Sequence, residues 1–203
     1  MLNNRVFDGV SARILVKTRR CQKKLWQYDP DTYLHCQKVA QVSYFLSHLL
    51  RLPSDAAQYV YLGALIHDLG KTAIPKIVLH KTGALTPEER AMMQRHPSLG
   101  REIALSIMKN VPETEKQVVL DVVEFHHERV DGKGYPYGMS GTEIPLAARI
   151  VAVADALDAM VSYRSYRSKP KNVKQALEEL KHNSGYQFDR KVVGKLVEFF
   201  TTY

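Results

Sequence analysis

Cysteine, long hydrophobic runs and strand-like patterns are all scarce in this chain of 203 residues. The two cysteines, Cys21 and Cys36, have no paired spacing, which argues against a disulfide framework and nearly excludes a thiolate metal site. No apolar run approaches the roughly 18 to 20 uncharged residues of a membrane span, and the N-terminus lacks the basic-then-apolar layout of a secretory signal. We therefore expect a soluble, cytoplasmic protein in which any metal is held by nitrogen and oxygen ligands.

The absence of strand signals points to an all-α fold. Period-2 alternation and Asn-Gly turns are missing, whereas apolar residues recur three and four positions apart. With 45% apolar residues, the chain can bury one substantial core. We expect a compact bundle of about seven to nine helices, in which residues 1–28 form a leading helix or linker and residues 29–203 form the functional domain.

Local signals place the expected helix ends. Ser54 is expected to cap a helix that stops at a left-handed Gly70, and Thr86 and Glu89 have the spacing of a capping box. The longest non-helical piece is 128–144, and a loop of that length in a compact helical domain is more often functional than idle. The helices are expected over roughly 33–50, 54–69, 86–96, 98–109, 113–127, 145–162, 172–183 and 190–201.

The formal net charge of +8 favours anionic ligands such as phosphates. The excess gathers in two segments, one with Arg19 and Arg20 near the N-terminus and one with Arg164 and Arg167. Aromatic residues are not interleaved with the first segment, so a solvated helix face explains it better than a nucleic-acid patch does. We expect no nucleic-acid polymer among the partners.

Histidines and aspartates recur at the expected helix ends. Taken singly, each of them is more often a hydrogen-bonded structural residue than a metal ligand. The joint pattern is different, because His67-Asp68 ends an apolar helix and Asp155 and Asp158 share one face of another. Buried carboxylates need compensating positive charge, and a divalent metal supplies it. The set therefore predicts a multinuclear centre of imidazole and carboxylate ligands, which suits transition metals.

Two longer motifs make a resemblance specific. HDLGK at 67–71 and HHERVDGKGYPYGMSGTEIPLAARIVAVADALDAM at 126–160 closely resemble the HD-GYP family, a bacterial branch of the HD metal-dependent phosphohydrolases. The resemblance implies an all-helical HD bundle with the GYP loop over a site for two or three divalent ions, iron or manganese. The implied metal ligands are Asp31, His35, His67, Asp68, His96, His126, His127 and Asp155.

The resemblance also implies roles for single residues. Asp68 is the expected bridge between metals, and Asp31 stands where three-metal members carry a longer glutamate, which favours two ions here. Lys71 is expected to hold a substrate phosphate and to take part in catalysis. Arg164 and Arg167 are expected to contact substrate, although Ser165 replaces the proline that is usual between the arginines. Tyr135 is expected either to contact substrate or a partner or to serve as an aromatic plug under the loop, since loop aromatics serve both purposes. From their sequence positions alone, Asp158 is expected to orient a ligand or a water, and Glu128 to hold Arg129 or a histidine.

The activity implied is hydrolysis of cyclic di-GMP to pGpG, or on to GMP, by a metal-bridged hydroxide. A signalling protein bound through the GYP loop and a homodimer are further expected partners. Two alternatives stay open: a non-catalytic cyclic-dinucleotide receptor or protein-interaction module, and a phosphohydrolase for another nucleotide such as a hybrid cyclic dinucleotide. Completeness of the ligand set favours catalysis over the receptor.

Overall fold

The computed structural model describes residues 10, 12–163 and 170–202. Among them there is no strand, and the only β-type pairings are two isolated bridges. The described chain forms nine α-helices longer than one turn and a single turn, α4. The all-α prediction is confirmed. The helices are α1 Ala12–Tyr28, α2 Pro30–Leu49, α3 Ser54–Ile66, α4 Lys76–Leu79, α5 Pro87–Met93, α6 His96–Ile107, α7 Glu113–Phe125, α8 Leu146–Val161, α9 Val173–His182 and α10 Arg190–Thr202.

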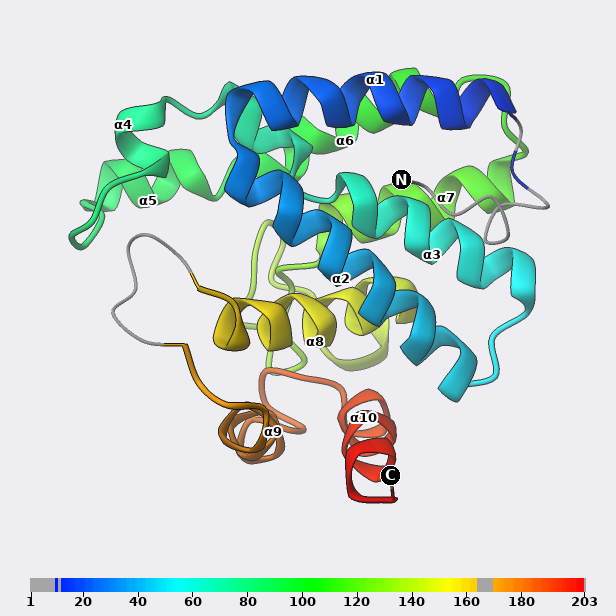
Figure 1. Cartoon of the computed structure of the whole chain (residues 1–203), viewed down its shortest axis with the longest axis vertical. Coiled ribbons are helices and arrows are strands. Elements are labelled where there is room, and N and C mark those ends of the chain that lie inside the picture. Colours follow the sequence, from blue (N-terminus) through cyan, green and yellow to red (C-terminus); the bar gives the residue numbers. More distant parts are fainter. Residues whose placement is uncertain (1–9, 11, 164–169, 203) are drawn as a thin grey trace.

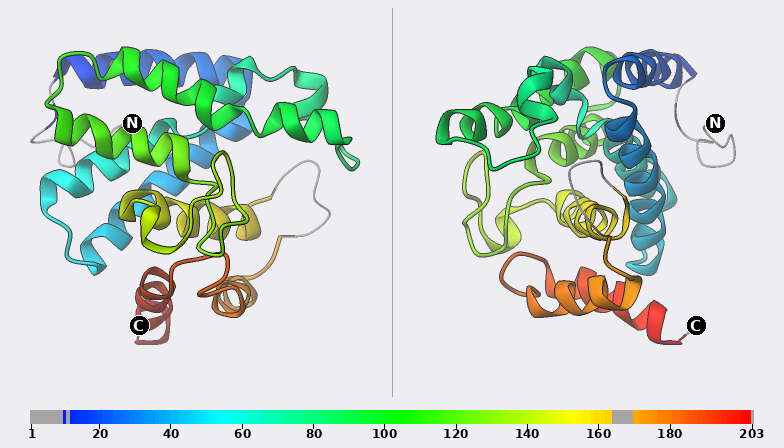
Figure 2. Two further views of the ribbon diagram at one scale, coloured as in Figure 1. Left: turned by 180° about the vertical axis from the view of Figure 1, so that it is seen from behind. Right: turned by 60° about the vertical axis from the view of Figure 1, so that its left-hand side comes forward.

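One hydrophobic core joins the described helices other than α4 and α5. Helices α4 and α5 lie together at one edge of the molecule (Figure 1). Helix α2 packs against α3 on one side and α8 on the other, and α3 packs in turn against α7. Because α2 and α3 are covered on several sides, residues such as Leu46 and Leu62 are fully buried. Helix α1 and the pair α9–α10 lie at opposite ends of the molecule, with α8 between them (Figure 2). In the described residues no helix is long and apolar enough to cross a membrane.

Of the two predicted helix N-caps, the one at Thr86 is confirmed and the one at Ser54 is wrong. Thr86 and Glu89 form the predicted capping box at the start of α5. Ser54 is not a cap: Pro53 occupies the N-cap position of α3, with no side-chain cap bond. Helix α3 already ends at Ile66, and the chain continues through the 3₁₀ turn η2 Leu69–Ala73.

Gly70 has a different purpose from the one predicted. Its φ is not positive, so it is not a left-handed stop signal. A Cβ there would lie 1.9 Å from the carbonyl oxygen of His96 and 2.6 Å from the amide nitrogen of Gly100. Gly70 therefore allows η2 and α6 to touch backbone to backbone, which brings His96 beside the end of α3.

The long loop between α7 and α8 is folded back on the end of α7. Only the short 3₁₀ turn η3 Gly141–Glu143 interrupts it. Gly132 and Gly138 have φ of +74° and +69°, whereas Gly134 is in close backbone contact with Glu128 and Arg129. The glycines of this loop thus provide positive φ at two positions and close backbone approach at a third.

Candidate metal centre

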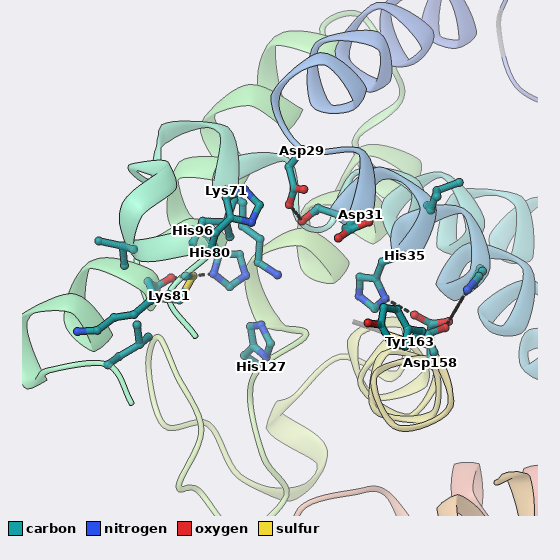
Figure 3. A pocket seen from close by; sticks show the side chains of 18 of the residues that line it. Asp29, Asp31, His35, Lys71, His80, Lys81, His96, His127, Asp158 and Tyr163 are labelled. Carbon is teal, nitrogen blue, oxygen red and sulfur yellow. Dashed lines mark hydrogen bonds and ion pairs between the residues drawn. The ribbon is translucent and has the colours of Figure 1, made fainter. Parts of the chain in front are cut away.

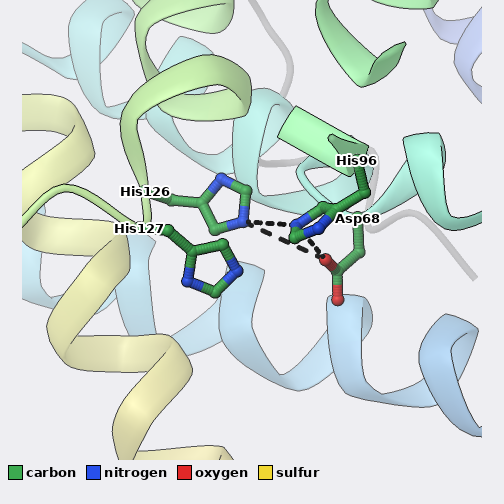
Figure 4. A group of neighbouring side chains, drawn as sticks. All are labelled: Asp68, His96, His126 and His127. Atoms are coloured by element: carbon green, nitrogen blue, oxygen red, sulfur yellow. Dashed lines mark hydrogen bonds and ion pairs between the residues drawn. The ribbon is translucent and has the colours of Figure 1, made fainter. Parts of the chain in front are cut away.

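Five helices deliver the predicted histidines and aspartates to one place. His35 comes from α2, His67 and Asp68 from the end of α3, and Asp155 from α8. His96 is the first residue of α6, and His126 and His127 directly follow α7. Figure 4 shows four of these side chains converging from three separate stretches of the sequence. Helix ends suit this purpose, because a residue there can project into the space between helices.

The first cluster contains Asp68, His96, His126 and His127, whose ligand atoms all lie within 4.8 Å of one another. Asp68 Oδ1 is 3.2 Å from His96 Nε2 and 4.0 Å from His126 Nε2. The Nε2 atoms of His96 and His126 are 3.3 Å apart. These atoms converge on one point between α3, α6 and the end of α7.

The second cluster contains His35, His67 and Asp155, again with ligand atoms within 4.8 Å of one another. His35 Nε2 lies 2.9 Å from Asp155 Oδ1. The other oxygen of Asp68, Oδ2, lies 3.4 Å from His67 Nε2 and 3.8 Å from His35 Nε2. Asp68 thus faces the first cluster with one oxygen and the second with the other.

Several of the imidazoles are oriented by a hydrogen bond on the far side of the ring. The Nδ1 atoms of His67, His96 and His126 each lie 2.7 to 3.1 Å from backbone carbonyl oxygens of the preceding helical turn. With the proton on Nδ1 donated to the carbonyl, the lone pair of Nε2 points into the cluster. His35 Nδ1 is held instead by the carboxylate of Asp158 at 2.5 Å, so Asp158 does orient a histidine of the cluster.

The donor set fits divalent metals. His67 Nε2 and Asp68 Oδ1 are buried without a hydrogen-bond partner, although His67 Nε2 lies 3.4 Å from Asp68 Oδ2 and Asp68 Oδ1 lies 3.2 Å from His96 Nε2. Such a geometry arises when lone pairs aim at a shared point rather than at each other. Burial lowers the pKa of His127 to about 3, which keeps its ring neutral, as a metal ligand must be. Burial would raise the pKa of Asp68, but Lys71 and His67 hold it well below its usual range.

A cavity of about 460 Å³ opens beside the clusters (Figure 3). His35, His96 and His127 form part of its wall, and Lys71 projects into it with Nζ 2.6 Å from Asp68 Oδ2. The volume is within the range of small-molecule sites. A ligand in this cavity therefore lies against both the clusters and a cation.

The remaining predicted residues have four different outcomes. Tyr135 lines the cavity and stacks on His127, with ring centroids 4.7 Å apart. Asp31 lines the cavity as well, but its exposed carboxylate belongs to neither cluster. Arg164 and Arg167 lie outside the described residues. Glu128 makes no direct contact of the expected kind with Arg129 or a histidine, because its carboxylate binds backbone amides of the long loop and Arg129 pairs with Asp131.

Two residues near the clusters escaped the sequence reasoning. Cys36, fully buried, forms a third potential metal-holding group with His67 and Asp68, so sulfur is closer to the site than its lack of paired spacing suggested. Lys38 lines the cavity, and its Nζ lies 3.9 Å from Asp158. Cys36 and Lys38 follow His35 within three positions on α2. This closeness to a predicted ligand is the signal in the sequence that could have placed them near the site.

Comparison with known proteins gives one family model and several relatives. The model described as HD domain matches residues 17–192. A cyclic di-GMP phosphodiesterase of Pseudomonas aeruginosa is 35% identical over 97% of this chain and 46% of its own length. A 3'3'-cGAMP-specific phosphodiesterase of Vibrio cholerae is 37% identical over 85% of this chain and 32% of its own length. The chain therefore spans about a third to a half of these relatives.

A solved structure shares the fold. The HD domain of the L. monocytogenes phosphodiesterase PgpH, in complex with cyclic-di-AMP, superposes with a TM-score of 0.59 at 18% identity. The match covers 87% of this chain and 91% of that domain. At this identity the likeness concerns the arrangement of helices.

Proposed function

The chain belongs to the HD domain family, and on that premise we propose that it is a metal-dependent phosphodiesterase acting on cyclic di-GMP. One observation carries the proposal: the two oxygens of Asp68 face two separate groups of imidazoles beside a cavity that holds a lysine. A lone structural carboxylate needs only one partner. A carboxylate shared between two ligand groups is the arrangement that hydrolysis of a phosphodiester by two metals requires.

The two clusters divide the proposed ligands between two ions. His96, His126 and His127 would hold one ion, His35, His67 and Asp155 would hold the other, and Asp68 lies between the two groups of ligands. When bound, such ions supply Lewis-acid polarisation of the phosphate and a more acidic water. Nitrogen and oxygen ligands suit iron or manganese. The exposed Asp31 lies outside both clusters, which favours two ions over three.

Lys71 is the proposed phosphate ligand. Its ammonium lies at the boundary between the Asp68 carboxylate and the cavity, with a side chain that is 17% exposed. A phosphate placed there would gain a charge-assisted hydrogen bond, and the contact strengthens as negative charge builds up on the phosphate oxygens. Arg164 and Arg167 remain proposed substrate contacts on grounds of sequence.

Tyr135 forms part of the proposed substrate wall. Its ring covers one face of His127, and burial, together with Asp68 and Asp155, raises the pKa of its hydroxyl. The hydroxyl therefore stays protonated and can donate a hydrogen bond at neutral pH. We assign it to substrate contact rather than to proton transfer.

The substrate is proposed from the chemistry of the cavity and from the relatives. The cavity is lined by Lys38, Lys71 and Lys81 beside the candidate metal centre, which suits a phosphodiester. Relatives from P. aeruginosa and Thermotoga maritima are named cyclic di-GMP phosphodiesterases. Relatives named for cGAMP make the hybrid dinucleotide the principal competitor. With two ions we expect pGpG as the end product.

The test combines metal analysis with a substrate panel. Protein purified without chelator is analysed for metals per chain and then incubated with cyclic di-GMP, 3'3'-cGAMP and cyclic di-AMP while linear products are followed. We expect two transition metals per chain and the highest kcat/KM on cyclic di-GMP. Binding of all three without turnover, at full metal content, would identify a receptor instead. Faster turnover of 3'3'-cGAMP would transfer the proposal to the hybrid dinucleotide.

A further inference from the structure

Glu128 is a buried carboxylate that the proposed metal centre does not use. It follows His126 and His127 in the chain, and only 3% of its surface is exposed. Within the described part of the chain, no cation forms an ion pair with it: its neighbour Arg129 pairs with Asp131. Burial of an uncompensated carboxylate is costly, so its partners must be found elsewhere.

The partners are three consecutive backbone amides of the long loop. Glu128 Oε1 accepts hydrogen bonds from the N–H groups of Tyr137, at 2.7 Å, and Gly138, at 3.2 Å. Oε2 accepts one from the N–H of Met139, at 3.0 Å. The loop therefore wraps its amide dipoles around the carboxylate, as in a small anion site.

A second carboxylate one helical turn earlier holds the same part of the loop. The hydroxyl of Tyr137 donates to Glu124 Oε1 at 2.9 Å, and Arg101 Nε pairs with the other oxygen of Glu124 at 2.6 Å. Tyr137 is thus held through its backbone by Glu128 and through its side chain by Glu124. Residues 137–139 of the loop therefore cannot shift without breaking the hydrogen bonds to both Glu128 and Glu124.

The other half of the loop rests on the histidine pair itself. The amide of Tyr135 donates to the carbonyl oxygen of His127 at 3.2 Å. Gly134 packs so closely that a Cβ would lie 2.5 Å from Glu128 Cα. The ring of Tyr135 then stacks on the imidazole of His127, with 26° between the planes.

We propose that Glu128 is a positioning residue that locks the GYP loop onto the His126-His127 turn, so that Tyr135 holds the imidazole of His127 in the orientation the metal centre requires. The inference deepens the proposed function and rests on it. Glu128 touches neither cluster, and it acts through the loop amides and the Tyr135 ring.

A carboxylate is required at this position because three donors converge on two oxygens. A carboxylate is acceptor-only, and hydrogen bonds to a charged acceptor are about twice as strong as neutral ones. In Glu128→Gln, the isosteric carboxamide turns an NH₂ group towards at least one backbone N–H. The loop must then move or lose a bond, although the volume of the side chain is unchanged.

The test compares Glu128→Gln with Glu143→Gln as a matched control. Glu143 lies in the same loop and its carboxylate also accepts a backbone amide, that of Ser140, but it is exposed and has no link to His127. Both variants and the wild type are loaded with cobalt(II), and the d–d absorption spectrum, the cobalt content and the amide hydrogen exchange of residues 137–139 are recorded. Tyr135→Leu serves as a second variant that removes the stacked ring and leaves Glu128 in place.

In Glu128→Gln we expect faster exchange at residues 137–139, a changed cobalt spectrum at unchanged fold, and a loss of about 10- to 100-fold in cobalt affinity or kcat/KM. Tyr135→Leu should change the cobalt spectrum in the same direction, and Glu143→Gln should leave it as in the wild type. An unchanged spectrum and unchanged affinity in Glu128→Gln despite faster exchange would overturn the inference, as would an equal change in Glu143→Gln. If the wild type itself shows no cobalt d–d bands, the proposed metal centre fails instead.

Discussion

Replacing Asp68 with asparagine removes one negative charge and leaves the shape of the side chain. The carboxylate is 2% exposed and has four imidazole nitrogens within 4.0 Å, two beside each oxygen. Asp68 belongs to the first cluster and also lies within 4.0 Å of His35 and His67 of the second. Asp155, by contrast, belongs to the second cluster alone. Asp68→Asn therefore tests the sharing of one anion between two sites.

The magnitude follows from the charge that is lost. A cation within 4 Å of this carboxylate, at an effective dielectric constant of about 20, gains about 4 kcal/mol for each unit of charge. That energy corresponds to about a thousandfold change in an equilibrium or rate constant. We expect Asp68→Asn to lower kcat/KM at least about a thousandfold and to reduce the metal content per chain.

The assay separates metal binding from folding. Elemental analysis gives metals per chain, and thermal unfolding with and without added metal gives the stabilisation that binding contributes. The variant should stay folded without metal, because Lys71 can turn towards the cavity, while the rise in Tm on adding metal should shrink. Asp121→Asn makes the same replacement on α7, away from the clusters, and should behave as the wild type. Two metals per chain with undiminished turnover in Asp68→Asn would refute the shared-anion reasoning.

Three further predictions concern substrate, packing and pH. Lys71→Ala should lower kcat on cyclic di-GMP far more than it lowers metal content, since a contact made in the transition state appears in kcat. Lys23 is exposed, and Lys23→Ala should change neither kcat nor metal content. Equal losses of kcat in both variants would place the phosphate elsewhere. Gly70→Ala should lower the free energy of unfolding by about 3 kcal/mol or more, because its Cβ would meet the backbone of α6, while Gly83→Ala, which has open space, should be neutral in urea unfolding. Asp189→Ala removes the carboxylate that accepts the first backbone N–H groups of α10 and that pairs with Arg149 of α8. This substitution should lower the free energy of unfolding by about 2 to 4 kcal/mol at pH 7. Burial would raise the pKa of Asp189, but backbone amides and the arginine of α8 hold it below 3.8, so its contribution is present above pH 3.8 and is lost as pH falls below that value; a stability gap that persists at pH 2 would contradict this assignment.

Much of the candidate site could be predicted from the sequence, because its ligands depend on residue type and local position. Imidazoles and carboxylates at helix ends point into the space between helices, and HDLGK and HHERVDGKGYP carry that arrangement within a few residues. The capping box of Thr86 and Glu89 was predictable for the same reason, since a cap joins residues three apart. Local interactions of this kind are complete within a single stretch of chain.

Contacts between distant segments were decided by the tertiary structure. Asp158 was expected to orient a ligand or a water, but its partner, His35, is 123 positions away, so the pairing depends on how α2 crosses α8. The role of Gly70 depended on the approach of α6, which no neighbouring residue reveals. Glu128 was assigned the wrong partner because the return path of the loop, not its own neighbours, brings three amides to it.

By itself, then, the sequence determined the helical class, the kinds of ligand and the two motifs that hold most of them, because periodicity, caps and side-chain chemistry are properties of short segments. Only the tertiary structure decided that one oxygen of Asp68 faces His96 while the other faces His67. It also decided that Tyr135 stacks on His127. The physical reason is that an atom-to-atom direction across a site depends on the packing of several helices at once, and each packing contact involves residues that the chain brings together only when the whole core forms.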